Sequence, residues 1–242
     1  MKHLYNKFRK ILSNLTNNIE MAQCSYSQMG EDLIISFIFQ VIGIEKPTYL
    51  DIGAHDPIYL SNTWLFYEKG SSGVCVEPDP ELYAKIKKRR PRDVCINSGV
   101  CGGDNSTANF YIMSARALNT FSREEAERYQ SYGSYNIVET KKLPLVNINS
   151  IIRDNFKEWP NLISIDVEGM DFEILSSLDF DTYRPEVVCV ETITYAEDDT
   201  QKKIPEILEL MKSKGYMIFG DTYINTIFVD PAAWDRRLTR NK

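Results

Sequence analysis

Acidic residues stand at the ends of three short apolar runs in this sequence. Glu77 and Glu191 each close one run, and Asp166, with Glu168 two residues further on, follows a third. If the runs are parallel strands, their carboxyl ends meet at one edge of a sheet, where open α/β sheets bind ligands. Carboxylates gathered there could hold the hydroxyl groups of a ribose, ligate a divalent cation or remove a proton from a substrate.

The loop after residues 49–52 indicates which cofactor such a crevice would take. Gly53 ends the apolar run, and Pro57 prevents regular structure from continuing. A dinucleotide site needs the pattern GxGxxG, whereas here Gly53 is followed by His55 and Asp56. The loop therefore predicts a cofactor with one nucleoside and no phosphate, of which S-adenosylmethionine is the common candidate. An ordinary strand and turn would explain the loop alone, but Glu77 at the end of the next strand favours the cofactor site.

These residues need a sheet to position them, and the sequence alternates apolar runs with amphipathic segments as an α/β sheet requires. Ser27 is expected to cap a helix that runs to Gly43. The last two strands, separated by Gly220 and Asp221, are expected to form an antiparallel hairpin at the sheet edge. Strands are expected at residues 49–52, 73–77, 94–97, 108–113, 143–146, 161–167, 186–192, 216–219 and 224–229, and helices at 62–69, 80–90, 148–156, 170–178 and 204–214.

Composition indicates one enlarged domain and argues against several classes of protein. At 242 residues and 43% hydrophobic content, the chain can bury one substantial core. The net charge of −6 gives no electrostatic case for binding nucleic acid, so a small molecule or glycan fits better. Five cysteines without a CxxC pair predict a reducing cytoplasm and no structural zinc. No run approaches the roughly 18 apolar residues of a membrane span, and the start lacks a signal-peptide block.

Two segments stand apart from the regular alternation. Residues 1–25 form a basic amphipathic arm, expected to pack or to support a homodimer; attachment to a membrane surface or a partner enzyme is the alternative. Residues 26–242 are expected to form the main domain. Within it, residues 114–142 are polar and rich in tyrosine, which is typical of a lid or substrate loop and equally of a surface segment.

With these pieces in place, the sequence resembles the FkbM family of S-adenosylmethionine-dependent methyltransferases over residues 27–229. The motifs that carry the resemblance are SQMGED at 27–32, LDIGAHDPIYLSNT at 50–63, VEP at 76–78 and, the most family-specific, ISIDVEGMDFEIL at 163–175. The resemblance implies a Rossmann-like class I methyltransferase fold with a seven-stranded, mostly parallel sheet. It also implies methyl transfer to an oxygen, with sugars and polyketides as family substrates.

The sequence departs from the family at two places. The usual small glycine turn of the first loop is replaced by His55-Asp56-Pro57. An acid that the family carries near the start of the helix before the fourth sheet strand is Asn149 here. The first departure resembles a subgroup feature, and the second leaves the role of that position open.

Methyl transfer from a sulfonium is an in-line displacement, so the site must align an acceptor oxygen and take its proton. His55 could be the base, or it could only hydrogen-bond its loop. Alternatively, Mg²⁺ or Mn²⁺ on Asp166 and Glu191 would lower the pKa of the acceptor hydroxyl. Glu168 would then be a third ligand, a base or a helix-terminal acid. Carboxylates would also attract the sulfonium without any metal.

The resemblance, together with the topology, implies how the residues share the cofactor. Gly53 would allow close backbone approach, Glu77 would take the ribose hydroxyls, and Ser98 or its neighbours would face the adenine edge. The full predicted cofactor set is Gln28, Glu31, Asp51, Gly53, Glu77, Ser98 and Asp166, with Gln28 and Glu31 toward the amino acid end.

The sequence thus predicts an O-methyltransferase acting on a sugar hydroxyl, with the sugar nucleotide-linked, in bacterial capsule or natural-product assembly. The alternative is a cofactor-binding scaffold without chemistry that recruits biosynthetic partners. The presence of Asp51, Glu77, Asp166 and Glu191 favours the enzyme.

Overall fold

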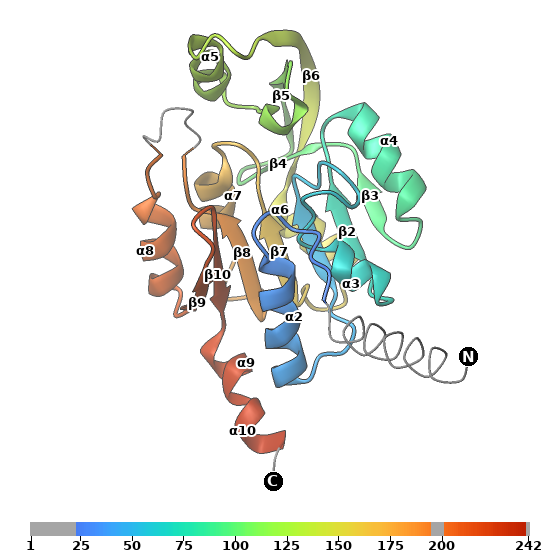
Figure 1. Cartoon of the computed structure of the whole chain (residues 1–242), viewed down its shortest axis with the longest axis vertical. Coiled ribbons are helices and arrows are strands. Elements are labelled where there is room, and N and C mark those ends of the chain that lie inside the picture. The colour runs from blue at the N-terminus through green and yellow to red at the C-terminus, as the bar shows by residue number, and fades with distance from the viewer. Residues whose placement is uncertain (1–22, 195–200, 241–242) are drawn as a thin grey trace, which may run out of the picture.

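The centre of the molecule is a sheet of seven strands in the order β3-β2-β1-β7-β8-β10-β9 (Figure 1). The computed structural model describes residues 23–194 and 201–240, so most of the predicted arm at residues 1–25 lies outside the described residues. Six of these strands run in the same direction, and β10 is antiparallel to both of its neighbours, β8 and β9. The strands are β1 (Tyr49–Ile52), β2 (Gly73–Val76), β3 (Val94–Ile96), β7 (Leu162–Ile165), β8 (Val187–Glu191), β9 (Met217–Asp221) and β10 (Asn225–Val229).

Helices cover both faces of this sheet and bury its apolar side chains in two separate cores. Strands β1 and β7 are buried along their whole length, which explains why they read as continuous apolar runs. One core lies against α6 (Ile148–Asn155), α7 (Asp171–Ser177) and α8 (Pro205–Ser213). The other lies against α2 (Glu31–Ile42), α3 (Trp64–Glu68), α4 (Pro80–Arg89) and α9 (Pro231–Asp235), beyond which comes α10 (Arg237–Arg240).

The strand order reverses between β1 and β7. From β1 the chain continues outward to β2 and β3, whereas β7 begins the other half of the sheet on the opposite side of β1. Loops that leave the carboxyl ends of strands on either side of such a switch point diverge and leave a crevice between them. The fold therefore provides a ligand site above β1 and β7.

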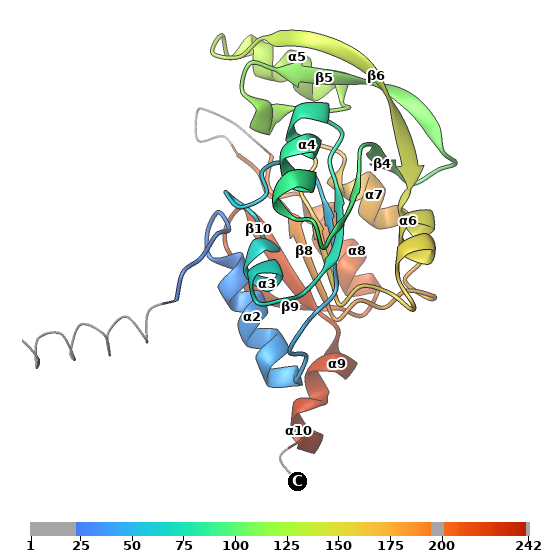
Figure 2. The same cartoon turned by 90° about the vertical axis from the view of Figure 1, so that its right-hand side faces the viewer.

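A second, smaller sheet stands over this end of the molecule (Figures 1 and 2). It contains β4 (Gly99–Cys101), β5 (Ser106–Met113) and β6 (Ile137–Asn147) in the order β4-β6-β5. Between β5 and β6 the chain forms a 3-10 turn, η1 (Arg116–Leu118), and the helix α5 (Arg123–Ser131). Residues 114–136, here called the η1–α5 segment, have a small core of their own that includes Leu118, Ala126 and Tyr129.

The predicted sheet and its antiparallel edge are confirmed, and the differences are local. The predicted turn at Gly220 and Asp221 is wrong, because both residues continue β9 and the chain turns at residues 222–224. The helix after Ser27 begins only at Glu31, because Gly30 in a left-handed conformation (φ 91°) precedes it. The Ser27 hydroxyl still accepts a hydrogen bond from the Asp32 amide at 3.3 Å. Strand β6 starts six residues before the predicted strand, within the segment predicted to be an insertion. None of the helices in the described ranges is long and apolar enough to cross a membrane.

Candidate active site

A cavity of about 350 Å³ opens at the switch point between β1 and β7. The ends of β1, β2, β7 and β8 form its floor, and the η1–α5 segment and the loop after β9 contribute to its walls. Nearly every residue predicted from the sequence for the site lines this cavity: Gln28, Asp51, Gly53, His55, Glu77, Ser98, Asp166, Glu168 and Glu191. Glu31 is the exception.

The packing of the fold, independent of any ligand, requires a glycine at position 53. Gly53 has a φ of 82°, and a Cβ placed on it would lie 1.8 Å from the carbonyl oxygen of Asp166. The amide of Asp166 in turn donates to the carbonyl of Ile52 at 3.1 Å, which draws the end of β7 against β1. The absent side chain therefore lets the loop carrying Asp166 close onto the sheet, a reason different from the close ligand approach predicted from the sequence.

Replacing Gly53 with alanine is expected to lower the free energy of unfolding by about 2–5 kcal/mol, from backbone strain and overpacking together. Gly133 is the matched control, because it has a φ of 80° and no atom within 4 Å of the position that a Cβ would take. Gly133→Ala should cost only about 1–2 kcal/mol, from the backbone conformation alone. Urea unfolding of both variants measures the difference, and equal losses would show that the contact with β7 is unimportant.

Glu77 follows β2 and holds the backbone of two loops. Its carboxylate accepts hydrogen bonds from the amides of His55, at 2.9 Å, and Asp79, at 2.8 Å. Burial raises the pKa of Glu77 to about 7, although these two backbone donors oppose the shift. The amide donors leave further lone pairs on both carboxylate oxygens, which can accept the hydroxyl groups of a ribose.

His55 lies on the same side of the cavity as Glu77. Its backbone is left-handed, with a φ of 46°, and burial lowers the pKa of its imidazole. The charged groups that act on the imidazole are Asp56, Lys85 and Asp79, all on the β1 and β2 side. The structure therefore brings His55 to the cavity wall beside Glu77, and the acids after β7 and β8 are not among its charged neighbours.

Asp51 is tied to a buried arginine beneath the cavity. Thr63 donates to its carboxylate at 2.5 Å, and the guanidinium of Arg90 lies 3.8 Å away. Arg90 has no solvent exposure and also bonds Asp93 at 2.7 Å. Burial raises the pKa of Asp51, and the Arg90 charge opposes that shift. Asp51 thus shapes the cavity floor and carries part of a structural ion network at the same time.

Ser98 is only 2% exposed, and its hydroxyl has no hydrogen-bond partner among the residues that the structure describes. An unpaired buried hydroxyl costs free energy, and in a native protein it calls for an explanation such as a ligand. Ser98 lines the cavity just beyond β3, on the far side of Glu77 from the acids that follow β7 and β8. Its hydroxyl is therefore available to a hydrogen-bonding group of a ligand that also reaches Glu77.

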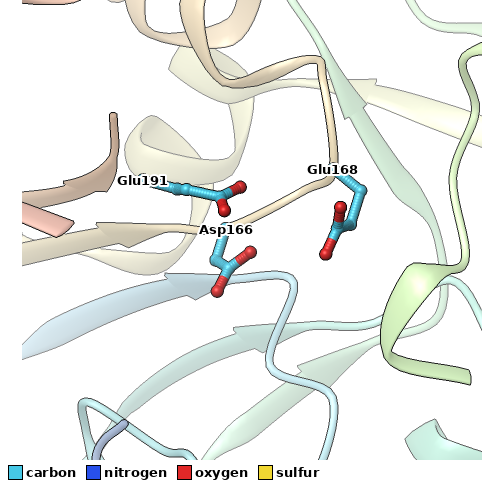
Figure 3. Close-up of side chains that lie close together, drawn as sticks. All are labelled: Asp166, Glu168 and Glu191. Carbon is cyan, nitrogen blue, oxygen red and sulfur yellow. The ribbon is translucent and has the colours of Figure 1, made fainter. Parts of the chain in front are cut away.

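Asp166, Glu168 and Glu191, here called the acid cluster, meet at the other end of the cavity (Figure 3). One oxygen from each carboxylate lies within 4.8 Å of the others. Burial and the charges of Asp171 and Asp51 raise the pKa of Asp166 to about 7, and burial and the Asp166 charge raise that of Glu168 to about 8. The pKa of Glu191 is also raised, by burial and then by Asp166. Such a site favours a cation or hydrogen-bond donors.

The loop that carries Glu168 is held in an unusual conformation. Glu168 has a φ of 51°, and the hydroxyl of Tyr129 donates to its carboxylate at 2.5 Å. Thr120 donates to the Glu168 carbonyl at 2.8 Å. Below the loop, the Asp171 carboxylate accepts the amide of Val167 at 3.1 Å, as expected for an acid near the start of a helix. The η1–α5 segment therefore fixes Glu168 from above, and α7 fixes the loop from below.

Glu31 has a structural role in this structure. It is fully buried and accepts hydrogen bonds from Thr222 at 2.6 Å, Asn225 at 3.1 Å and the Met29 amide at 2.8 Å. Burial alone would raise its pKa, but these donors outweigh burial and lower it. Glu31 thus joins α2 to the loop before β10, whereas exposed Gln28 reaches the cavity wall.

Several residues of the η1–α5 segment were missed by sequence reasoning. Arg116 bonds Asp79 at 2.5 Å and Glu81 at 2.9 Å, and Asn119 bonds Asp79 at 3.1 Å. These contacts hold the segment to the loop after β2, while Thr120 and Tyr129 hold it to the loop after β7. In the sequence, only the polar, tyrosine-rich composition of the segment indicated a role at the site, and it did not identify the residues that make these contacts.

Asn149 lies away from the cavity. Its side chain donates to the carbonyl of Ser177 at 2.9 Å and accepts the amide of Asp179 at 2.9 Å. It therefore connects the start of α6 to the end of α7, and the residues that line the cavity do not include it.

The sheet order, with its reversed strand β10, and the carboxylate-lined cavity at the switch point define a Rossmann-like methyltransferase fold. Residues 51–218 match the family model described as the methyltransferase FkbM domain. The chain therefore belongs to the FkbM methyltransferase domain family, a family of the S-adenosylmethionine-dependent class. This confirms the resemblance drawn from the four motifs.

Among solved structures, the chain is similar to a TehB-like SAM-dependent methyltransferase from Corynebacterium glutamicum, with 10% identity, a TM-score of 0.43, and coverage of 93% of this chain and 99% of the other. It is also similar to an O-methyltransferase from Bacillus cereus in complex with SAH, with 10% identity, a TM-score of 0.42, and coverage of 91% and 89%. Among curated proteins no match was found.

Proposed function

We propose that this protein transfers the methyl group of S-adenosylmethionine to a hydroxyl oxygen of a sugar. The observation that carries the proposal is that one continuous cavity offers different polar groups at its two ends. Its β2 end offers Glu77 and the unpartnered hydroxyl of Ser98, and its β8 end offers the acid cluster. Three strand spacings separate the ends of β2 and β8 in the sheet, which is roughly 14 Å.

The first half of the proposal concerns the cofactor. Glu77 would accept the two ribose hydroxyls, Ser98 would bond the adenine edge, and the acids on the β1 and β7 side would attract the sulfonium. Met29, Gly30 and exposed Gln28 lie before α2, on the route to the amino acid end. The loop 53–57 contains no phosphate-binding glycine pattern, which favours this cofactor over a dinucleotide.

The second half concerns the acceptor oxygen. As the acceptor attacks, the new O–CH₃ bond forms while the S–CH₃ bond breaks, and the electron pair of that bond stays on sulfur as S-adenosylhomocysteine. The acceptor proton must leave in the same step, and the carboxylates of the acid cluster are the acceptors placed for it. His55, on the nucleoside side, would orient its loop. A hydroxyl acceptor fits this arrangement because carboxylates accept hydrogen bonds from hydroxyl groups.

The acid cluster also fits a divalent cation. Opposite ligand oxygens around Mg²⁺, Mn²⁺ or Ca²⁺ lie about 4–5 Å apart, close to the separation among the three carboxylates. All three ligands are hard oxygen donors, which suits Mg²⁺ or Mn²⁺. Asp166, Glu168 and Glu191 would hold the cation, and a cation there would lower the pKa of a bound hydroxyl.

Removing divalent cations tests this part of the proposal. Rigorous chelation is expected to reduce turnover at least 10-fold, and added Mn²⁺ or Mg²⁺ should restore it. Mn²⁺ binding can be followed independently of activity by the loss of its free electron paramagnetic resonance signal. Glu191→Gln should weaken that binding, whereas Glu173→Gln, an exposed change on α7, should not. Full turnover after chelation would leave the carboxylates as the proton acceptors without metal.

The function itself is tested by binding and turnover together. Calorimetry is expected to show S-adenosylmethionine binding to the purified protein, and a panel of sugars should yield S-adenosylhomocysteine and a methyl ether. A capsule or natural-product context would follow from the sugar that is methylated. Binding of S-adenosylmethionine without turnover of any sugar would instead support the non-catalytic scaffold function, and absence of both would remove the proposed function.

A further inference from the structure

Four non-glycine residues in the described ranges have positive φ angles, and all four line the cavity. They are His55 (46°), Leu60 (58°), Glu168 (51°) and Tyr223 (77°). A left-handed backbone disfavours any residue with a Cβ, so glycine would be the easier choice at each position. Backbone strain of this kind clusters at ligand sites. The side chains of these four residues are therefore retained at a conformational cost.

Two of the four have no use in the chemistry proposed above. Leu60 and Tyr223 are apolar or aromatic, and they are 37% and 58% exposed although they line the cavity wall. Leu60 follows a turn in which the Asp56 carboxylate accepts the amides of Ile58 and Tyr59, each at 2.9 Å. The fold thus presents an apolar rim at the cavity mouth.

Tyr223 is held by a comparable arrangement on the other side of the cavity. Its amide donates to the Asp221 carboxylate at 2.8 Å, and Lys203 binds the same carboxylate at 2.8 Å. The preceding Thr222 is anchored to buried Glu31 at 2.6 Å. These contacts therefore hold the backbone of the loop in place, and with it the position of the Tyr223 ring.

The charge of the cavity restricts what can enter past this rim. Five carboxylates line it, on Asp51, Glu77, Asp166, Glu168 and Glu191. Among the described lining residues Arg116 is the one lysine or arginine, and Asp79 and Glu81 already bind it. A diphosphate group would add negative charge to this site without a lysine or arginine among those residues free to receive it, and even one divalent cation on the acid cluster would leave the five carboxylates in excess.

We infer that the acceptor is an uncharged, ring-shaped polyol whose apolar face packs on Leu60 and Tyr223 while its hydroxyl groups meet the acid cluster. This inference rests on the proposed function and names its substrate class. A pyranose has C–H groups on one face that pack against an aromatic ring, and hydroxyl groups at its edge that donate to carboxylates. A glycoside or a neutral glycan terminus fits this description, and a nucleotide-diphosphate sugar does not. Leu60 and Tyr223 are the specificity-determining residues.

Glycine substitutions at these two positions test acceptor binding without disturbing the fold. Leu60→Gly and Tyr223→Gly both suit the left-handed backbone, so the fold should be kept, and circular dichroism with thermal melting checks this. Each variant is expected to raise the KM for a neutral glycoside at least 10-fold, while the Kd for S-adenosylmethionine stays within 2-fold of the wild-type value. Tyr59→Ala is the matched control, because Tyr59 is 68% exposed beside Leu60 but does not line the cavity. Unchanged KM values in both glycine variants would overturn the assignment of the rim.

The substrate class is tested on the wild-type protein with two acceptor panels, methyl glycosides and the corresponding nucleotide-diphosphate sugars. The kcat/KM is expected to favour the neutral panel at least 10-fold, with or without Mn²⁺. Saturation-transfer NMR on protein loaded with S-adenosylhomocysteine gives a second readout that needs no turnover. Preference for the nucleotide sugars in either assay would overturn the inference and leave the proposed function intact. Failure of the cofactor to bind would instead remove the proposed function.

Discussion

Asp166→Asn is expected to lower kcat by about 10²–10⁴-fold and, in the same protein, to raise the melting temperature. The loss follows because the carboxylate is placed to take the acceptor proton or to hold the cation that activates the acceptor. The gain follows because Asp166 is one of three carboxylates crowded within 4.8 Å, with a pKa raised to about 7 by burial and neighbouring acids. The ionised acid therefore destabilises the fold above that pH, and asparagine cannot ionise.

The stability gain has a defined pH dependence. The folded pKa of Asp166 lies above its unfolded value, so the wild-type protein loses stability as the pH rises between about 4 and 7. Asp166→Asn should therefore be about 1–2 kcal/mol more stable at pH 8 in the presence of a chelator, and nearly unchanged at pH 4. Thermal melting at both pH values measures this. Glu173→Gln, on the exposed side of α7, is the control for both activity and stability. Full activity in Asp166→Asn would remove Asp166 from the catalytic machinery.

Glu77→Gln is expected to weaken S-adenosylmethionine binding by about 10²-fold, since two charge-assisted hydrogen bonds to ribose hydroxyls would be replaced by weaker ones. The wild-type affinity should also depend on pH. Burial raises the pKa of Glu77 to about 7, so below pH 7 the free protein must lose a proton before the carboxylate can accept both hydroxyls. Affinity should then rise about 10-fold per pH unit up to pH 7 and be constant above it.

Isothermal calorimetry between pH 5.5 and 8.5 measures both effects. The Glu77→Gln variant should bind weakly with no inflection near pH 7, because glutamine does not titrate. Arg116 and Asn119 hold Asp79 beside Glu77, so circular dichroism must show that the loop has not unfolded. An unchanged inflection in the variant would assign the titration to another group and would contradict the ribose role of Glu77.

The alternation of apolar runs and amphipathic segments was sufficient to predict a parallel sheet with acids at its carboxyl edge, because both depend on local pattern, whereas the number of strands came from the family resemblance. Strands such as β1 and β7 are buried on both faces and are therefore apolar throughout. The reversal of strand order then places Glu77, Asp166 and Glu191 around one cavity without any knowledge of side-chain packing.

The contacts made by the η1–α5 segment could not be predicted in this way. Tyr129 reaches Glu168 across 39 residues of sequence, and Arg116 reaches Asp79 across 37. Neither pair has a spacing that helix or strand periodicity would reveal. The same limit applies to Glu31, whose burial against Thr222 and Asn225 depends on how α2 packs beside β10.

We propose that one adenosine lies between Gly53 and Ser98, with the methyl-bearing sulfur of the cofactor toward the acid cluster. A crystal structure of the complex with S-adenosylhomocysteine tests this most directly. It should show both ribose hydroxyls within about 2.6–3.2 Å of the Glu77 carboxylate, the adenine edge at Ser98 and the sulfur facing Asp166. Adenosine bound elsewhere, or a ribose that makes no contact with Glu77, would contradict the account.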